Sequence, residues 1–191
     1  MDEPRNGDER SPDGVEALLA GLEDQADAIE GVYDDAAAED LARAARAEIP
    51  LLDRVRAASV VVIDIVDHGP VGGDVVSVGS DVVVLESPDG TWAVPIAGIT
   101  AVVGAPDAAE APSGVAGRLG LAAVVRSWAR ERSVVRVMRR GAAPLDGTID
   151  RVGADHFDLA EHDPGMPRLG AEVRRTVSVP LGAITALRRR P

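Results

Sequence analysis

Three side chains that could bind a metal ion lie close together in the second half of the chain: His156, Asp158 and His162. In an extended strand, alternate side chains share one face, so this spacing places all three opposite Phe157 and Leu159. Imidazole and carboxylate groups are ligands for zinc or a harder ion. The three residues are therefore a candidate metal site, and the alternative is a set of solvated polar side chains on an outer face. The sequence predicts no other metal site and no cofactor.

Arginine is the second residue type that could do chemistry, since all 20 basic residues are Arg. Clustered guanidinium groups could neutralise phosphates in a salt-dependent manner. The second half, however, also holds 8 acidic residues, and aromatic residues make up only 2% of the chain, so few rings are available to stack on bases. Nucleic-acid binding is thus possible but not favoured over a solvated or docking surface. The candidate anion contacts are Arg136, Arg139, Arg140, Arg151, Arg188, Arg189 and Arg190.

The net charge of −12 is unevenly distributed. Residues 1–112 carry 24 acids and 6 Arg, a net −18, whereas residues 113–191 carry 8 acids and 14 Arg, a net +6. Such a split indicates intramolecular docking, head-to-tail assembly or one face that meets an anion. Two solvated surfaces of different composition would explain it equally well.

Catalytic motifs are not readable. There is no Cys and there are only 3 His, and no Ser-His-Asp arrangement can be identified. The Gly-rich stretches match neither a phosphate-binding loop nor a dinucleotide fingerprint. We therefore expect no enzymatic activity, and a metal-dependent enzyme is the less favoured alternative.

The sequence of the elements that must position these residues occurs twice in the chain. Ser59-Val60-Val61 returns as Ser133-Val134-Val135, and Gly73–Asp81 returns without a gap as Gly147–Asp155, both at an offset of 74. After an insertion of 11 residues within His162–Arg175 the offset becomes 85, where Val94-Pro95 returns as Val179-Pro180. A repeat of this kind predicts two copies of one structural unit.

Each copy predicts a short helix followed by five short antiparallel strands. In the first copy the helix is expected at residues 51–57, and a helix at about 115–130 precedes the second copy. The strands are rich in β-branched residues and are separated by turn signals such as Pro88-Asp89-Gly90. The expected strands of the first copy are 59–66, 71–78, 81–86, 91–94 and 99–103, with a one-turn connector at 95–98.

The pattern of Gly73, Val78-Gly79, Asp81–Leu85 and Val94-Pro95-Ile96, with its counterparts in the second copy, resembles the Sm-like small β-barrel. The resemblance implies a mainly β fold with N-terminal helices: two tandem five-stranded Sm-like barrels, each preceded by a short helix. The chain is also similar to uncharacterised proteins of GC-rich bacteria, some labelled Fis-type transcriptional regulators.

Two departures bear on function. Sm-like RNA binders have an Asn and an Arg-Gly pair in loops where this chain has Gly79-Ser80-Asp81 and Ala97-Gly98, and the second copy lacks them too. A Fis-type regulator needs a helix-turn-helix with a basic second helix, but the helices expected within residues 13–48 are acidic.

The segments expected from the sequence are a disordered tail at 1–12, an acidic helical segment at 13–48, a first barrel at 49–104, a linker at 105–116 and a second barrel at 117–191. The acidic N-terminus does not resemble a secretory signal, and no apolar run is long enough to span a membrane. We therefore expect a cytoplasmic, non-enzymatic interaction or assembly module with a protein partner or self-association. A nucleic-acid-associated regulator is the alternative.

Overall fold

The computed structural model describes residues 39–163 and 173–190. The chain divides into two compact units, Met1–Glu48 and Ile49–Pro191. In the first unit, residues 39–47 are helical, and the tail and helix expected before residue 39 lie outside the described residues. None of the helices in the described ranges is long and apolar enough to cross a bilayer. The described strands all lie in the second unit.

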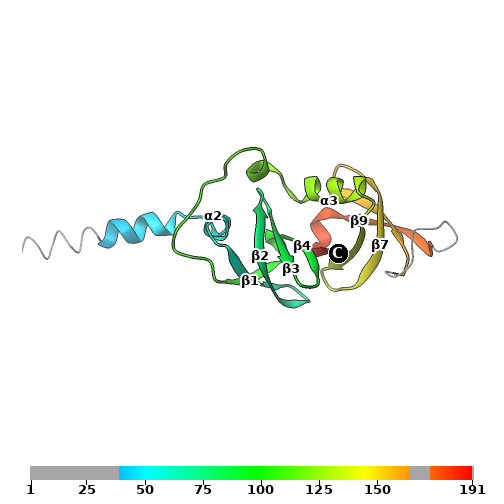
Figure 1. Ribbon diagram of the computed structural model, residues 1–191, viewed down its shortest axis with the longest axis horizontal. Coiled ribbons are helices and arrows are strands. Elements are labelled where there is room, and N and C mark those ends of the chain that lie inside the picture. Colours follow the sequence, from blue (N-terminus) through cyan, green and yellow to red (C-terminus); the bar gives the residue numbers. More distant parts are fainter. Residues whose placement is uncertain (1–38, 164–172, 191) are drawn as a thin grey trace, which may run out of the picture. The chain divides into compact units, whose positions relative to one another are not determined.

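The first half of this unit is a short helix followed by five strands (Figure 1). Pro50 supplies the extended residue before the helix, and buried Leu52 and Val55 anchor it. A one-turn 3₁₀ helix after Pro95 connects the last two strands. The elements are α2 (Leu51–Arg56), β1 (Val60–Ile65), β2 (Gly69–Val78), β3 (Val82–Ser87), β4 (Gly90–Pro95), η1 (Ile96–Gly98) and β5 (Ile99–Val103).

The second half repeats this order. The helix expected at 115–130 is interrupted, because Gly120 is extended and separates a 3₁₀ turn from the α-helix; that expectation is wrong between 118 and 121. The elements are η2 (Ala116–Arg118), α3 (Leu121–Arg130), β6 (Val134–Arg139), β7 (Ala142–Val152), β8 (His156–Glu161), β9 (Arg175–Pro180), η3 (Leu181–Ala183) and β10 (Ile184–Arg189).

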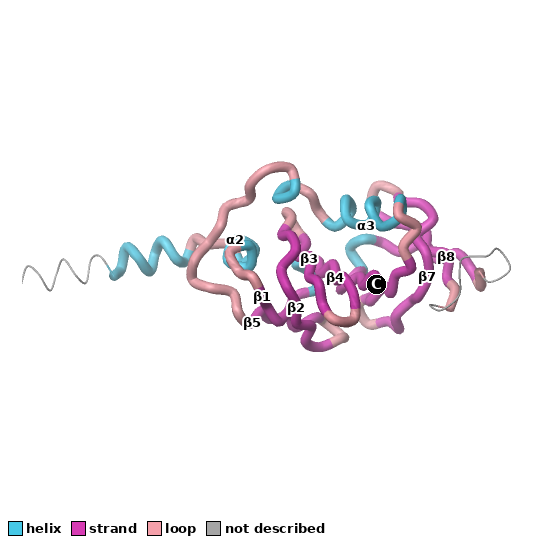
Figure 2. The backbone as a smooth tube through the Cα atoms, in the orientation of Figure 1, coloured by secondary structure: helices cyan, strands magenta, loops and turns pink. Residues whose placement is uncertain are grey.

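The ten strands of the described residues belong to one antiparallel sheet, in the order β5-β1-β2-β3-β4-β10-β6-β7-β8-β9. Within each half the last strand pairs with the first, and the two halves meet where β4 pairs with β10. Figure 2 shows the strands of the first half, β1 to β5, beside one another. In this pairing Leu187 lies opposite Ala93 and Arg188 lies opposite Trp92. The sheet therefore begins and ends on β5 and β9, which are counterparts of β10 and β4.

The register of the two halves is the same. Val83 pairs with Val94 as Phe157 pairs with Val179, at the offsets of 74 and 85 found in the sequence. The irregularity between Val75 and Ser77 recurs between Ile149 and Arg151. The duplicated sequence thus specifies equivalent strand pairings, down to one extra residue in β2 and in β7.

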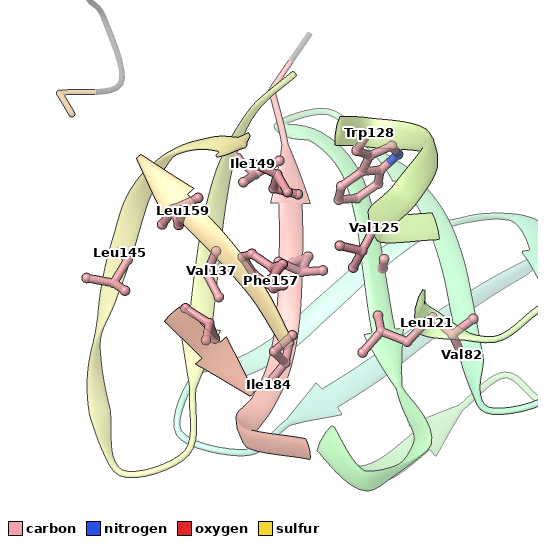
Figure 3. Close-up of a cluster of buried hydrophobic side chains, with 14 of the residues drawn as sticks. Val82, Leu121, Val125, Trp128, Val137, Leu145, Ile149, Phe157, Leu159 and Ile184 are labelled. Atoms are coloured by element: carbon pink, nitrogen blue, oxygen red, sulfur yellow. The ribbon is translucent and has the colours of Figure 1, made fainter. Parts of the chain in front are cut away.

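Each half has a mostly aliphatic core that also includes residues of the other half. Trp92 and Val55 lie in the first core with Met138 and Ala186 of the second half. The second core surrounds Phe157, with α3 covering it through Val125 and Trp128 (Figure 3). Val82, Val84 and Ala93 of the first half also belong to this second core. Because side chains cross in both directions, we expect the two halves to unfold together.

Polar contacts reinforce the junction of the halves. Asp81 accepts a hydrogen bond from the backbone N–H of Leu121 at 2.7 Å, which caps α3 from a loop of the first half. Arg140 donates to the carbonyl oxygen of Ala97 at 2.6 Å, and the carboxylate of Asp67 accepts the N–H of Gly141 at 2.7 Å.

Candidate functional site

The three candidate metal ligands do not form one site. His156 and Asp158 lie on β8, and His162 follows its end. The Nδ1 of His156 lies 2.8 Å from a carboxylate oxygen of Asp155, whereas the Nε2 of His162 lies 2.9 Å from the hydroxyl of Thr148. In the part of the chain that the structure describes, no three His, Asp or Glu side chains could together hold a metal ion.

The expected exposure of these side chains is wrong for two of them. His162 is only 2% exposed and Asp158 is also buried. Asp158 lies between β7 and β9, where it accepts hydrogen bonds from Ser178 Oγ at 2.7 Å and Arg151 Nε at 3.0 Å. The Ser178 hydrogen bond lowers the pKa of Asp158 more than burial raises it, and Arg151 lowers it further. These contacts join β7, β8 and β9, so the carboxylate has a structural role.

Six of the seven candidate anion-binding arginines contact acceptors within the protein. Arg136 forms two parallel hydrogen bonds with Asp146 at 2.8 and 2.7 Å, which raise the pKa of its guanidinium group. Arg139 donates to the carbonyl oxygen of Ala143 at 2.6 Å. The contacts of Arg140 with Ala97 and of Arg151 with Asp158 were described above. Arg190 follows the end of β10.

The two remaining arginines lie on β10, and Arg188 binds the first half of the unit whereas Arg189 binds α3 of the second half. Arg188 forms an ion pair with Asp89 at 2.6 Å and lies over the ring of Trp92 at 5.4 Å. Arg189 forms an ion pair with Glu131, and its guanidinium lies over the ring of Trp128 at 5.5 Å. The positive charges of these six candidate arginines are therefore paired or hydrogen-bonded within the protein, at the junction and in the sheet.

The Arg188–Asp89 pair makes stability depend on pH. Burial raises the pKa of Asp89, but hydrogen bonds from Trp92 and Arg188 lower it by more, so it lies below its ordinary value. The stabilisation is present above the unfolded-state pKa of about 4 and is lost as the pH falls through the lower folded-state pKa. We expect Asp89→Asn to reduce the free energy of unfolding at pH 7, and this deficit to shrink below about pH 4. Urea unfolding at both pH values measures it, and an unchanged deficit would contradict the ion pair.

The sequence did not identify which two strands form the edges of the sheet. Thr185 and Ala186 of β10 are 0% exposed, whereas their counterparts Thr100 and Ala101 of β5 are exposed. The same contrast separates β4 from β9, because Ala93 is buried and its counterpart Ser178 is exposed. β10 and β4 are buried because they pair with each other at the junction of the halves. β5 and β9 are the two ends of the described sheet and have no such pairing.

The β5 edge is apolar. The strand reads Ile99-Thr100-Ala101-Val102-Val103 and carries no charge. Val103 is 65% exposed and lies opposite Val62, which is also exposed. An uncharged strand with one unpaired side is a template for pairing with another chain. The β5 edge is therefore the candidate functional site.

Comparison with known proteins adds no assignment: no family model, no curated protein and no solved structure matches this chain significantly.

Proposed function

We propose that this protein is a non-enzymatic, cytoplasmic interaction module built from two Sm-like small β-barrels, which binds a protein partner by adding a strand of that partner to β5. The barrel assignment is supported by the order of elements in each half, a helix and then five strands with a 3₁₀ connector before the last. That order is the one on which the resemblance to Sm-like proteins depends.

Devices that bend a sheet occur at the same place in both halves and support this assignment. A Cβ at Gly73 would lie 2.3 Å from the carbonyl oxygen of Glu86, and one at Gly147 would lie 2.2 Å from that of Ala160. Each glycine lies on the long second strand of its half, shortly before the extra residue. Close backbone approach and a bulge in one strand are how a small sheet curls over its own core.

One observation carries the proposed function: among the described strands, β10 pairs with β4 on its outer side, whereas its counterpart β5 pairs only with β1. Inside the protein, β4 pairs with Leu187, Arg188 and Arg189 on the outer side of β10, and Thr185, Ala186 and Leu187 are completely buried. β5 presents the same backbone register against β1 as β10 presents against β6. The junction thus shows, within one chain, that a strand equivalent to β5 can pair with a further strand on its outer side.

The chemistry of the β5 edge favours an extended, uncharged peptide segment as ligand. In such binding the main-chain hydrogen bonds supply affinity and alternate side chains supply specificity. The arginines that would support the nucleic-acid alternative are mostly paired with acidic groups or carbonyl oxygens, as described above. We therefore place the partner among proteins.

The test compares two substitutions that introduce the same charge at exposed positions of the first half. The partner is isolated from the native host after nuclease treatment and purified, and its affinity is measured by calorimetry. We expect Ala101→Glu to weaken binding by about tenfold or more, since a charge on the edge must be desolvated when a strand is added.

Val76→Glu is the matched control, because Val76 is 59% exposed but lies on β2. Affinity should be unchanged in this variant. Equal affinities of the wild type and Ala101→Glu, or a dependence on nucleic acid, would refute binding at β5.

A further inference from the structure

The junction of the two halves depends on glycine at two positions, Gly90 at the start of β4 and Gly98 at the end of η1. A Cβ at Gly90 would lie 2.2 Å from the carbonyl oxygen of Arg189, and one at Gly98 would lie 2.1 Å from that of Thr185. Both oxygens belong to the backbone of β10, so neither can move aside like a flexible side chain. Gly90 also has a φ of +127°, which other residues rarely adopt. Side chains at these two places would hold β4 away from β10.

The half of the chain that contains the edge strand β9 has no glycine at either of these two positions. The counterparts of Gly90 and Gly98 in the second half are Arg175 and Ala183. Arg175 is not among the described non-glycine residues with positive φ, so the start of β9 differs from the start of β4. Their contact points on a second copy would be Gly104 and Thr100, the counterparts of Arg189 and Thr185.

The ion pair of Arg175 adds to the difference. Its Nε lies 2.5 Å from Glu161, on the neighbouring strand β8. Gly90 has no side chain and lies where the chain turns from β3 into β4. A second copy approaching β9 would therefore meet a charged pair where β10 meets a glycine.

From this we propose that β5 accepts a strand from a different protein, one with glycine at two positions eight residues apart, and that Arg175 and Ala183 exclude the chain's own β9. This inference rests on the proposed function and adds which partner strands β5 can accept. Repetition by itself would favour head-to-tail growth, in which β9 of one copy adds to β5 of the next. Arg175 and Ala183, at the positions of the two glycines, prevent a second copy from extending the sheet. β5 therefore remains available to a partner protein.

The first experiment asks whether removing the two side chains permits head-to-tail association. The double variant Arg175→Gly with Ala183→Gly is compared with the wild type by sedimentation velocity over a range of concentrations. We expect the wild type to remain monomeric and the double variant to associate. Adding Ala101→Glu to the double variant should abolish that association, because it alters the edge that receives β9.

Ala183→Gly alone serves as a second variant that keeps the Arg175–Glu161 ion pair, and we expect it to associate more weakly than the double variant. Circular dichroism checks that each variant is folded. A wild type that already associates, with loss of association in Ala101→Glu, would overturn the exclusion of β9. Monomeric behaviour of both folded glycine variants would overturn the role of Arg175 and Ala183.

The second experiment addresses the partner's sequence. A labelled peptide with the sequence of residues 90–98 is titrated with the intact protein, and binding is followed by fluorescence anisotropy. We expect it to bind the wild type, to bind Ala101→Glu less well, and to bind about tenfold more weakly when its last glycine is alanine.

Equal binding of the glycine and alanine peptides, or binding of neither at millimolar concentration, would overturn the glycine requirement. These outcomes are distinct from failure of the proposed function, which is measured by the effect of Ala101→Glu on the purified partner.

Discussion

Replacing Trp92 with alanine is expected to lower the free energy of unfolding by about 3–5 kcal/mol, the largest effect of any single substitution considered. Trp92 is 1% exposed and lies in the core of the first half. Its indole N–H donates to Asp89 at 2.8 Å, the guanidinium of Arg188 covers one face, and the ring of His68 lies 5.1 Å away. Alanine would leave a cavity and would also remove a contact that joins β4 to β10.

The same variant tests whether the two halves unfold as one. Because Met138 and Ala186 enter the first core and Val82 enters the second, loss of one core should destabilise both. We expect one denaturant transition, followed by circular dichroism, in the wild type and in Trp92→Ala, with the midpoint shifted to lower concentration.

Trp128→Ala, in the second core, is the matched comparison and should shift the same transition. Two separate transitions, of which Trp92→Ala moves only one, would show that the halves are independent.

The strand pattern was predictable because burial and repetition agree. The first strand is visible in the sequence as the β-branched run Val60–Ile65, and its copy at Val134–Val137 confirms the position of the strand. Repetition also locates the inserted residues between β8 and β9, where the offset changes. A core made of aliphatic residues constrains such a pattern strongly, since a slip of one residue would turn every Val to the other face.

The joining of the halves was not predictable in the same way. Most strand pairings within a half join strands that are consecutive in the chain, but β4 and β10 are brought together by groups far apart in the chain, such as Asp89 and Arg188. Alternation says which face of a strand is buried and nothing about which strand lies beside its edge. The two glycines that permit the approach read in the sequence as ordinary turn residues.

The arginines were misleading for a related reason. Arg136 and Arg188 look like a basic surface when only the sequence is considered, because their acceptors are supplied by another strand and by the turn between β3 and β4. Once Asp146 lies opposite Arg136 across the β6–β7 pairing, the charge is neutralised locally. A guanidinium that has a carboxylate partner and an aromatic ring beneath it is less available to a phosphate than its charge suggests.

The second large effect is expected for Gly98→Ala, which should destabilise the protein by about 1–3 kcal/mol. The added methyl group would lie 2.1 Å from the carbonyl oxygen of Thr185, so β10 and η1 would have to separate. Alanine in place of glycine also restricts the unfolded chain, which favours folding by about 0.4–1 kcal/mol. The steric term exceeds this gain, and the net result should be a loss of stability measured by urea unfolding.

Gly182→Ala separates the steric cost from the general effect of removing a glycine. Gly182 belongs to the corresponding connector η3 of the second half, but a Cβ there would meet nothing within 4 Å. Only the unfolded-state term applies, so this variant should be neutral or more stable by up to about 1 kcal/mol. If Gly98→Ala proved as stable as Gly182→Ala, close approach would not hold the junction together, and the argument that Ala183 excludes a second copy would lose its basis.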